Sequence, residues 1–238
     1  HLGDESLKIV DASWYLPAQN RDAAAEFAAC RIPGAVFFDQ DKIVDPASEL
    51  PHTIASTQDF EHAAGELGLS RSDTIVVYDG PGMFSAPRVW WLLRTFGADK
   101  TYVLDGGFDS WKKQGLPTDA GEPAQPAPAT FSATLNSGAI TDFDQMRSIV
   151  ADATSQIADA RGPGRFTGVE AEPRPGMRSG HMPGARNVPF PNLSEGGRLK
   201  PIAELRKTLE ASGLDLYKPV VTTCGSGVTA AVITLALQ

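Results

Sequence analysis

The sequence is poor in cysteine and has no long apolar run. Only Cys30 and Cys224 occur among its 238 residues, which excludes a disulfide framework and the paired-cysteine motifs of zinc sites. The apolar stretches are far shorter than the roughly 20 residues that span a bilayer, and no signal-peptide pattern opens the chain. These absences favour a cytoplasmic protein without membrane partners.

Basic residues are also scarce. The sequence has 21 Lys and Arg against 29 Asp and Glu, a net charge of −8 and no cluster of basic residues. A surface for nucleic acid or anionic lipid is therefore not expected. With 42% hydrophobic residues the chain can form a soluble globular fold, and its expected partners are small molecules or other proteins.

One pattern of short motifs occurs twice along the chain. The matched segments are residues 9–12 and 157–160, 32–35 and 182–185, and 75–80 and 220–225. The offsets between partners are 148, 150 and 145 residues, and chance does not readily produce three matches in the same order. Internal repetition of this kind predicts two homologous domains.

The predicted domains are residues 1–117 and 139–238, and residues 118–138 form a linker. The first part of the linker contains Pro123, Pro126 and Pro128 among Ala, Gly and Glu. Such a composition cannot continue a helix or a central strand, so this segment is expected to be extended.

Each repeat alternates short β-branched runs with helical patterns, which predicts parallel strands joined by crossover helices. Residues 73–78 are nearly all apolar, as expected of a strand covered on both faces. Residues 85–97 carry Pro near the start and Gly at the end, which are signals for a helix. Trp90, Trp91 and Phe96 lie at helical spacing within it and are predicted to pack in the core. The fold class is therefore α/β, with two tandem domains that each contain a parallel sheet flanked by helices.

The second repeat is shorter than the first. Asp79 is followed by a further strand and helix before Pro117, whereas only 14 residues follow Cys224. The second domain is therefore expected to lack its last strand and helix.

Cys224 stands between a predicted strand and a predicted helix. The loop at residues 224–230 reads Cys-Gly-Ser-Gly-Val-Thr-Ala. Its glycines let successive backbone N–H groups point at one anion, an arrangement called a nest. A nest stabilises a thiolate, which is the nucleophilic form of cysteine. We therefore predict a catalytic Cys224, rather than the small buried apolar residue that an unpaired cysteine usually is.

Other loops that bind anions differ from this one. A nucleotide-phosphate loop needs Gly-Lys-Ser/Thr, which is absent here. A cysteine phosphatase closes its loop with Arg, whereas Ala230 follows Thr229. The position of Cys224 is held by Asp79 in the first repeat, which predicts one working site per chain and a non-catalytic first domain.

The loop and several other motifs resemble the 3-mercaptopyruvate sulfurtransferases, a two-domain family of the rhodanese superfamily. The shared features are the loop at 224–230, Pro-Gly-Ala in both repeats, residues 85–91 and Asp-Gly-Gly at 105–107. The resemblance covers nearly the whole chain. It implies transfer of sulfur from 3-mercaptopyruvate through a cysteine persulfide, with release of pyruvate and without a metal or organic cofactor. The implied acceptors are a thiol, such as thioredoxin or glutathione, or cyanide.

The resemblance also implies roles for residues near Cys224. Arg165 and Arg174 match arginines that hold the substrate carboxylate in the family, although the residues alone are equally compatible with solvated surface charges. Ser226 and Thr229 are implied to be catalytic groups that hydrogen-bond the sulfur or the 2-oxo group, and stabilisation of the loop is the alternative. The remaining implied substrate-binding residues are Gly225, Gly227 and Val228.

Three positions outside the loop are each interpreted separately. Asp22 matches an acidic residue that some schemes for the family place near the active loop, but a solvated Asp at a helix start is the simpler interpretation. Arg31 stands where the family usually has His, so a proton relay through that imidazole is not expected here. His181 holds the corresponding place in the second repeat and is predicted to stabilise a turn by hydrogen bonding.

Two other functions remain compatible with the sequence. The first is sulfur transfer from thiosulfate, but the related thiosulfate enzymes typically carry basic residues at the two positions after Cys, where this chain has Gly225 and Ser226. The second is a persulfide carrier or protein-binding module with little turnover. The loop chemistry favours the enzyme that uses 3-mercaptopyruvate.

Overall fold

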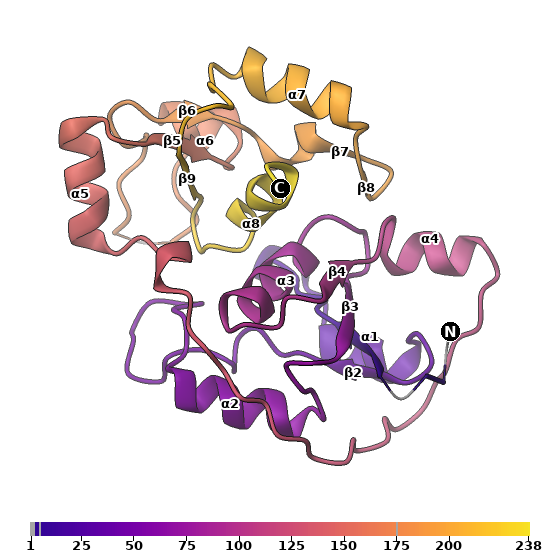
Figure 1. The fold of residues 1–238 in the computed structure, drawn as a ribbon. Coiled ribbons are helices and arrows are strands. Elements are labelled where there is room, and N and C mark those ends of the chain that lie inside the picture. Colours follow the sequence, from indigo (N-terminus) through magenta and orange to yellow (C-terminus); the bar gives the residue numbers. More distant parts are fainter. Residues whose placement is uncertain (1–2, 5, 175) are drawn as a thin grey trace. The chain divides into compact units, whose positions relative to one another are not determined.

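The computed structural model describes residues 3–4, 6–174 and 176–238, and the chain forms two compact units (Figure 1). The first unit contains the chain up to Ser137 together with Gly196–Arg198. The second contains Gly138–Glu195 and Leu199–Gln238. Each unit has its own parallel sheet, so the predicted pair of tandem α/β domains is confirmed. The predicted domain boundaries at 117 and 139 stay a prediction.

The sheet of the first unit has four parallel strands in the order β2-β1-β3-β4. These strands are β1 (Leu7–Asp11), β2 (Ala35–Phe37), β3 (Thr74–Tyr78) and β4 (Thr101–Val103). The helices are α1 (Ala23–Ala29), α2 (Thr57–Glu66), α3 (Ala86–Thr95) and α4 (Gly107–Lys113), with a 3-10 turn η1 (Pro17–Gln19). A helix lies between each pair of sequential strands from β1 to β4, as parallel pairing requires.

Helix α3 supplies the aromatic trio that the sequence assigned to the core. Trp90 and Phe96 are buried, and the Phe96 ring stacks on Phe60 with centroids 4.0 Å apart. Trp91 is only half-buried, and its ring lies 4.7 Å from the guanidinium carbon of Arg88. The core interpretation is confirmed for Trp90 and Phe96. Trp91 is less buried than these two, and one face of its ring makes a cation–π contact with Arg88.

The linker after α4 is extended and lies against the first unit. Arg31 and Asp119 exchange two backbone hydrogen bonds of 2.9 Å, and Arg31 Nη1 donates to Gly121 O at 2.8 Å. Further along, Ala129 N donates to Gly65 O at 2.9 Å. The proline-rich segment therefore finds its hydrogen-bond partners on the domain that precedes it.

The sheet of the second unit has three parallel strands in the order β6-β5-β9. They are β5 (Gln156–Asp159), β6 (Arg186–Asn187) and β9 (Val220–Thr223), and β7 (Ser194–Glu195) pairs with β8 (Arg198–Leu199). The helices are α5 (Phe143–Asp152), α6 (Pro163–Thr167), α7 (Ile202–Ala211) and α8 (Ala230–Ala236), with 3-10 turns η2 (Ser137–Ala139) and η3 (Phe190–Leu193). None of the helices formed by the described residues is long and apolar enough to cross a bilayer.

The core of the second unit lies around α8. The apolar face of this helix is buried together with side chains of β5, η3 and α7, and Cys224 packs against this cluster. The most buried members are Ala158, Ala160, Val188, Leu193, Leu209, Val232 and Ile233. Removal of this apolar surface from water fixes the strand and the helix on either side of the loop that carries Cys224.

The two sheets repeat the same local geometry. Asp11 and Asp159 end the first strand of each unit, and each carboxylate accepts the backbone N–H two residues later, at 2.8 and 3.0 Å. The Pro-Gly-Ala turns match as well, because Gly34 and Gly184 have φ of 75° and 77°, values that favour glycine. The duplication inferred from the sequence is thus present in the backbone.

The two units differ at one edge of the sheet. In the first unit β4 lies beyond β3, whereas in the described part of the second unit no strand lies beyond β9. This difference agrees with the lengths of the two repeats. The predicted lack of a final strand and helix in the second domain stays a prediction.

Candidate active site

Cys224 is the first residue after β9, and the loop that follows curls back toward its sulfur. Gly227 N donates to Cys224 Sγ at 3.1 Å, and Gly227 has φ of 80°, where residues with a Cβ are strained. The Val228 side chain is 1% exposed and fixes the middle of the loop in the core. One loop amide is therefore directed at the sulfur of the half-buried Cys224, and the nest of several amides around this sulfur stays a prediction.

Two guanidinium groups meet the residue that follows the cysteine. Arg174 Nη2 donates to Gly225 O at 2.9 Å. A Cβ added to Gly225 would lie only 2.7 Å from Arg165 Nη2, so the glycine leaves room for this guanidinium. The structure therefore brings Arg165, Arg174 and Gly225 together beside Cys224.

The two hydroxyl groups of the loop are less engaged. Thr229 occupies the N-cap of α8 without a capping hydrogen bond from its side chain, and both Ser226 and Thr229 are half-buried. Within the described residues, neither hydroxyl is hydrogen-bonded to Cys224. Their predicted contact with the sulfur or the 2-oxo group therefore stays a prediction.

A line of buried ion pairs leads from β5 to Arg165. Asp159 Oδ2 accepts from Arg161 Nη2 at 2.6 Å, and Arg161 Nη1 donates to Glu172 Oε1 at 2.7 Å. Glu172 Oε2 then accepts from Arg165 Nη2 at 2.5 Å. The side chains of Asp159, Arg161 and Glu172 are 2%, 10% and 4% exposed and are shielded from water, whereas that of Arg165 is 28% exposed. We call these four residues the carboxylate–guanidinium line.

The charges in this line stabilise one another. The hydrogen bond from Arg165 lowers the pKa of Glu172 below its usual value, while burial acts in the opposite direction. The hydrogen bond to Asp159 raises the pKa of Arg161. Glu172 is thus ionised at neutral pH.

Sequence reasoning did not predict this line as a unit. Asp159 could have been noticed, because it matches Asp11 in the repeat and ends a buried strand. The pairing of Arg161 with Glu172 could not have been predicted, because the chain brings these two residues together only by turning back after α6.

Comparison with known proteins identifies the fold family. The sequence pattern of the rhodanese-like domain matches residues 1–114 and again residues 142–238. The chain belongs to the rhodanese-like family.

Relatives of this rhodanese-like chain include human 3-mercaptopyruvate sulfurtransferase, which is 43% identical over 97% of this chain and 78% of the relative. The 3-mercaptopyruvate sulfurtransferase of Escherichia coli K12 is 41% identical over 100% of this chain and 84% of the relative. Chicken thiosulfate sulfurtransferase is also 43% identical, over 97% and 79% of the two chains. The crystal structure of SseA from Escherichia coli, described under the mechanism of 3-mercaptopyruvate sulfotransferases, superposes with a TM-score of 0.92 at 39% identity and covers 100% of this chain and 89% of that one.

The matching loop of the first rhodanese-like repeat forms a nest that is filled by a side chain of the loop itself. The Asp79 carboxylate is fully buried and accepts four backbone N–H groups at 2.6 to 3.0 Å. Burial raises the pKa of Asp79, and the four amides act in the opposite direction. The donors are Gly82, Phe84, Ser85 and Ala86. Gly82 has φ of 80° and lies three residues after Asp79, as Gly227 lies after Cys224.

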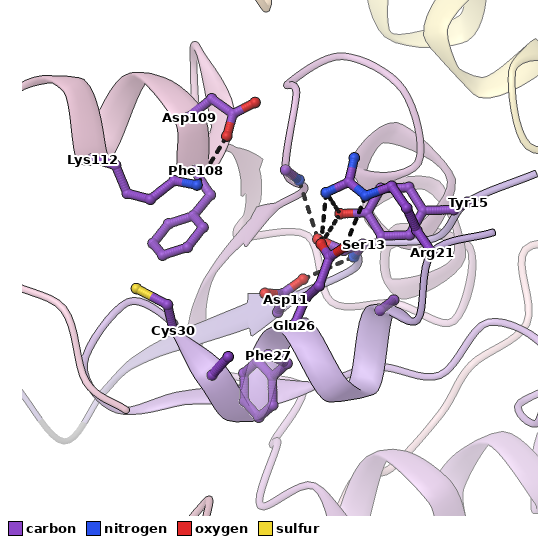
Figure 2. Close-up of a pocket in the computed structure, with 13 residues that line it drawn as sticks. Asp11, Ser13, Tyr15, Arg21, Glu26, Phe27, Cys30, Phe108, Asp109 and Lys112 are labelled. Carbon is purple, nitrogen blue, oxygen red and sulfur yellow. Dashed lines mark hydrogen bonds and ion pairs between the residues drawn. The ribbon is translucent and has the colours of Figure 1, made fainter. Parts of the chain in front are cut away.

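A cavity of about 320 Å³ opens near the end of β1 in the same unit (Figure 2). Its two basic side chains are paired with carboxylates, Arg21 with Glu26 at 2.6 Å and Lys112 with Asp109 at 3.1 Å. Cys30 also lines this cavity. Because both cations are already neutralised, the cavity does not have the charge of a second anion site.

The remaining predicted positions have local structural contacts. Asp22 is the N-cap of α1 and accepts from Ala25 N at 3.0 Å, which agrees with the simpler interpretation of this exposed carboxylate. His181 Nδ1 is 2.7 Å from Phe166 O, and the two rings stack at 3.8 Å. The accessory role of Asp22 stays a prediction. Among the described residues, no group of three or more His, Cys, Asp and Glu side chains could hold a metal ion.

Proposed function

We propose that this rhodanese-like chain is a sulfurtransferase that moves sulfur from 3-mercaptopyruvate to a thiol or cyanide through a persulfide on Cys224. The observation that carries the proposal is the half-buried Cys224 sulfur, which accepts an amide N–H of its own loop while Arg165 and Arg174 meet the next residue. This arrangement supports a nucleophile with a site for the donor carboxylate beside it. The names of the human and Escherichia coli relatives support the same reaction.

In the first half-reaction the Cys224 thiolate attacks the sulfur of 3-mercaptopyruvate. A new S–S bond forms, the C–S bond of the donor breaks, and its electron pair remains on the carbon as the enolate of pyruvate. The proton of the donor thiol balances the step, because it ends on this carbon and the persulfide is left as an anion. The loop amide of Gly227 is placed to stabilise sulfur anions before and after transfer.

The neighbouring residues bind and orient the donor. Arg165 and Arg174 hold the carboxylate of 3-mercaptopyruvate, and charge-assisted hydrogen bonds of this type contribute about 1.5–3 kcal/mol each. Ser226 and Thr229 supply hydroxyl donors for the 2-oxo group, whose oxygen gains negative charge as the enolate forms. Gly225, Gly227 and Val228 shape the loop.

In the second half-reaction an acceptor thiolate attacks the outer sulfur of the persulfide. The S–S bond to Cys224 breaks, and the cysteine leaves as a thiolate in the same loop. Thioredoxin, glutathione and cyanide are the acceptors that we propose. We place the reaction in the cytoplasm, because neither cysteine of the chain is in a disulfide.

Thiosulfate is the competing donor. The chain is 43% identical to both a 3-mercaptopyruvate and a thiosulfate sulfurtransferase, so overall identity does not separate the two. Gly225 and Ser226 place no cation directly after the nucleophile, which suits a monoanion better than a dianion. The ratio of kcat/KM for the two donors on one preparation tests this choice, and a higher value for thiosulfate would contradict it.

Cys224→Ser tests the nucleophile. The variant is expected to lose pyruvate production from 3-mercaptopyruvate, because a serine hydroxyl cannot store sulfur as a persulfide. Intact mass of the wild type after exposure to the donor is expected to show one added sulfur that cyanide removes. Cys30→Ser is the matched control and is expected to keep both properties.

The outcomes separate the alternatives. Wild-type rates in Cys224→Ser would refute the nucleophile. An added sulfur that no acceptor discharges would instead indicate a persulfide carrier or a protein-binding module with little turnover.

A further inference from the structure

The carboxylate–guanidinium line has no part in the bond changes above, yet it ends at a residue that binds substrate. We propose that Glu172 is a positioning and specificity-determining residue, which orients Arg165 and limits the positive charge of the site so that a monoanionic donor is preferred to a dianionic one. This inference rests on the proposed function and adds the basis of donor choice.

Glu172 holds Arg165 through two atoms of its guanidinium. Arg165 Nη2 donates to Oε2 at 2.5 Å and Arg165 Nε donates to Oε1 at 3.2 Å. A two-point contact fixes the plane of the guanidinium as well as its position. Because the Glu172 side chain is 4% exposed, water competes little for these hydrogen bonds.

Glu172 is itself held by the sheet. Arg161 Nη1 donates to its Oε1, while Arg161 Nε and Nη2 bind Asp159 at the end of β5 and Nη2 also donates to Gly180 O at 2.8 Å. Arg165 is therefore connected to a buried strand through two carboxylates. Groups supported in this way keep the geometry that binding requires.

Glu172 offsets one positive charge close to Cys224. Asp159 and Glu172 balance Arg161 and Arg165, and Arg174 is bound to a neutral carbonyl oxygen. These side chains together carry one positive unit, which the Cys224 thiolate of the reactive enzyme offsets. Removal of the Glu172 charge would add one positive unit at the donor site, and an added cation attracts a dianion such as thiosulfate more strongly than a monoanion.

The position of Glu172 in the sequence also supports its role in orienting Arg165. Glu172 lies two residues before Arg174, so one short segment supplies the second binding arginine and the carboxylate that orients the first. A displacement of this segment would move both Arg174 and the Glu172 carboxylate. The line is thus built around the donor site and is not an isolated structural ion pair.

The experiment compares Glu172→Gln with the wild type, using 3-mercaptopyruvate and thiosulfate as donors and cyanide as the acceptor. The ratio of kcat/KM for 3-mercaptopyruvate to that for thiosulfate is expected to fall about tenfold. Damage to the fold would lower both values and leave the ratio unchanged. Glu210→Gln, which removes a surface carboxylate 3.6 Å from Arg206 on α7, is the matched control and is expected to keep the ratio.

Glu172→Asp keeps the charge on a shorter side chain. This variant is expected to stay within about threefold of the wild-type ratio, since charge and not reach sets the preference between anions. A ratio unchanged in Glu172→Gln, or a tenfold fall in Glu172→Asp as well, would overturn the inference.

If the wild type turns over neither donor, the proposed function fails and the inference is tested by binding. Calorimetric titration with pyruvate and with thiosulfate then replaces the kinetics. A shift of relative affinity toward thiosulfate in Glu172→Gln supports the inference, and equal relative affinities in both proteins overturn it.

Discussion

Arg165 and Arg174 reach the same residue, Gly225, from different segments of the second unit. Arg165 belongs to the short helix α6, and Arg174 follows it in an irregular segment. A Cβ at position 225 would displace the Arg165 guanidinium from its present place. A single residue thus couples the nucleophile to the proposed carboxylate site.

Arg165→Ala and Arg174→Ala are each expected to raise KM for 3-mercaptopyruvate about 10- to 100-fold, because a charge-assisted hydrogen bond contributes about 1.5–3 kcal/mol. The effect on kcat is expected to be smaller, since a carboxylate is held alike in the ground and transition states. Steady-state kinetics of both variants provide the measurement. Arg147→Ala, an exposed substitution on α5, is the control. An unchanged KM in both variants would refute the proposed carboxylate site.

At the scale of elements, the strand–loop–helix unit occurs once with Cys224 and once with Asp79. In both loops a glycine three residues later donates its N–H to the leading side chain, at 3.1 and 2.6 Å. The first loop therefore carries its own anion, where the second holds a sulfur. This explains in physical terms why only one repeat is expected to carry substrate sulfur.

Asp79→Ala is expected to destabilise the first unit by on the order of 3 kcal/mol, because four buried amides lose their acceptor. All four tryptophans of the chain lie before residue 112, so tryptophan fluorescence during urea unfolding reports on this unit alone. Asp99→Asn, at an exposed position, is the control. A midpoint equal to that of the wild type would show that the amides find other partners.

Much of the fold was predictable from the sequence because its elements are marked locally. The apolar run of β3 and the Pro and Gly at the two ends of α3 are signals within a few residues, and the repeat itself located the loop of Cys224. The carboxylate–guanidinium line was not predictable, because Glu172 meets Arg161 only in the folded unit. The partial exposure of Trp91 depends on the same kind of tertiary information.

At the scale of the whole molecule, Arg31 gives the linker a fixed attachment. Its backbone pairs with Asp119 and its buried side chain donates to Gly121 O. The position at which the family usually has His therefore has a structural use in this chain. This structural role explains why the Arg31 guanidinium is buried, although no step of the reaction is predicted to use it.

Arg31→Ala is expected to make the linker several-fold more sensitive to elastase near Ala120, because the side-chain hydrogen bond to Gly121 O is lost and the segment opens more often. The rate of cleavage, followed by gel electrophoresis and mass spectrometry, provides the measurement. Lys42→Ala, which removes an exposed ion pair with Asp39 elsewhere in the first unit, is the control. Equal cleavage rates in Arg31→Ala and the wild type would contradict this role.

The attachments of the linker continue beyond Gly121. Ala129 N bonds Gly65 O, Thr134 N bonds Phe96 O at 3.0 Å and Asn136 N bonds Thr95 O at 2.8 Å. Since both ends of the proline-rich stretch are fixed on the first unit, extra residues inserted at 122–128 would form a surface bulge on that unit.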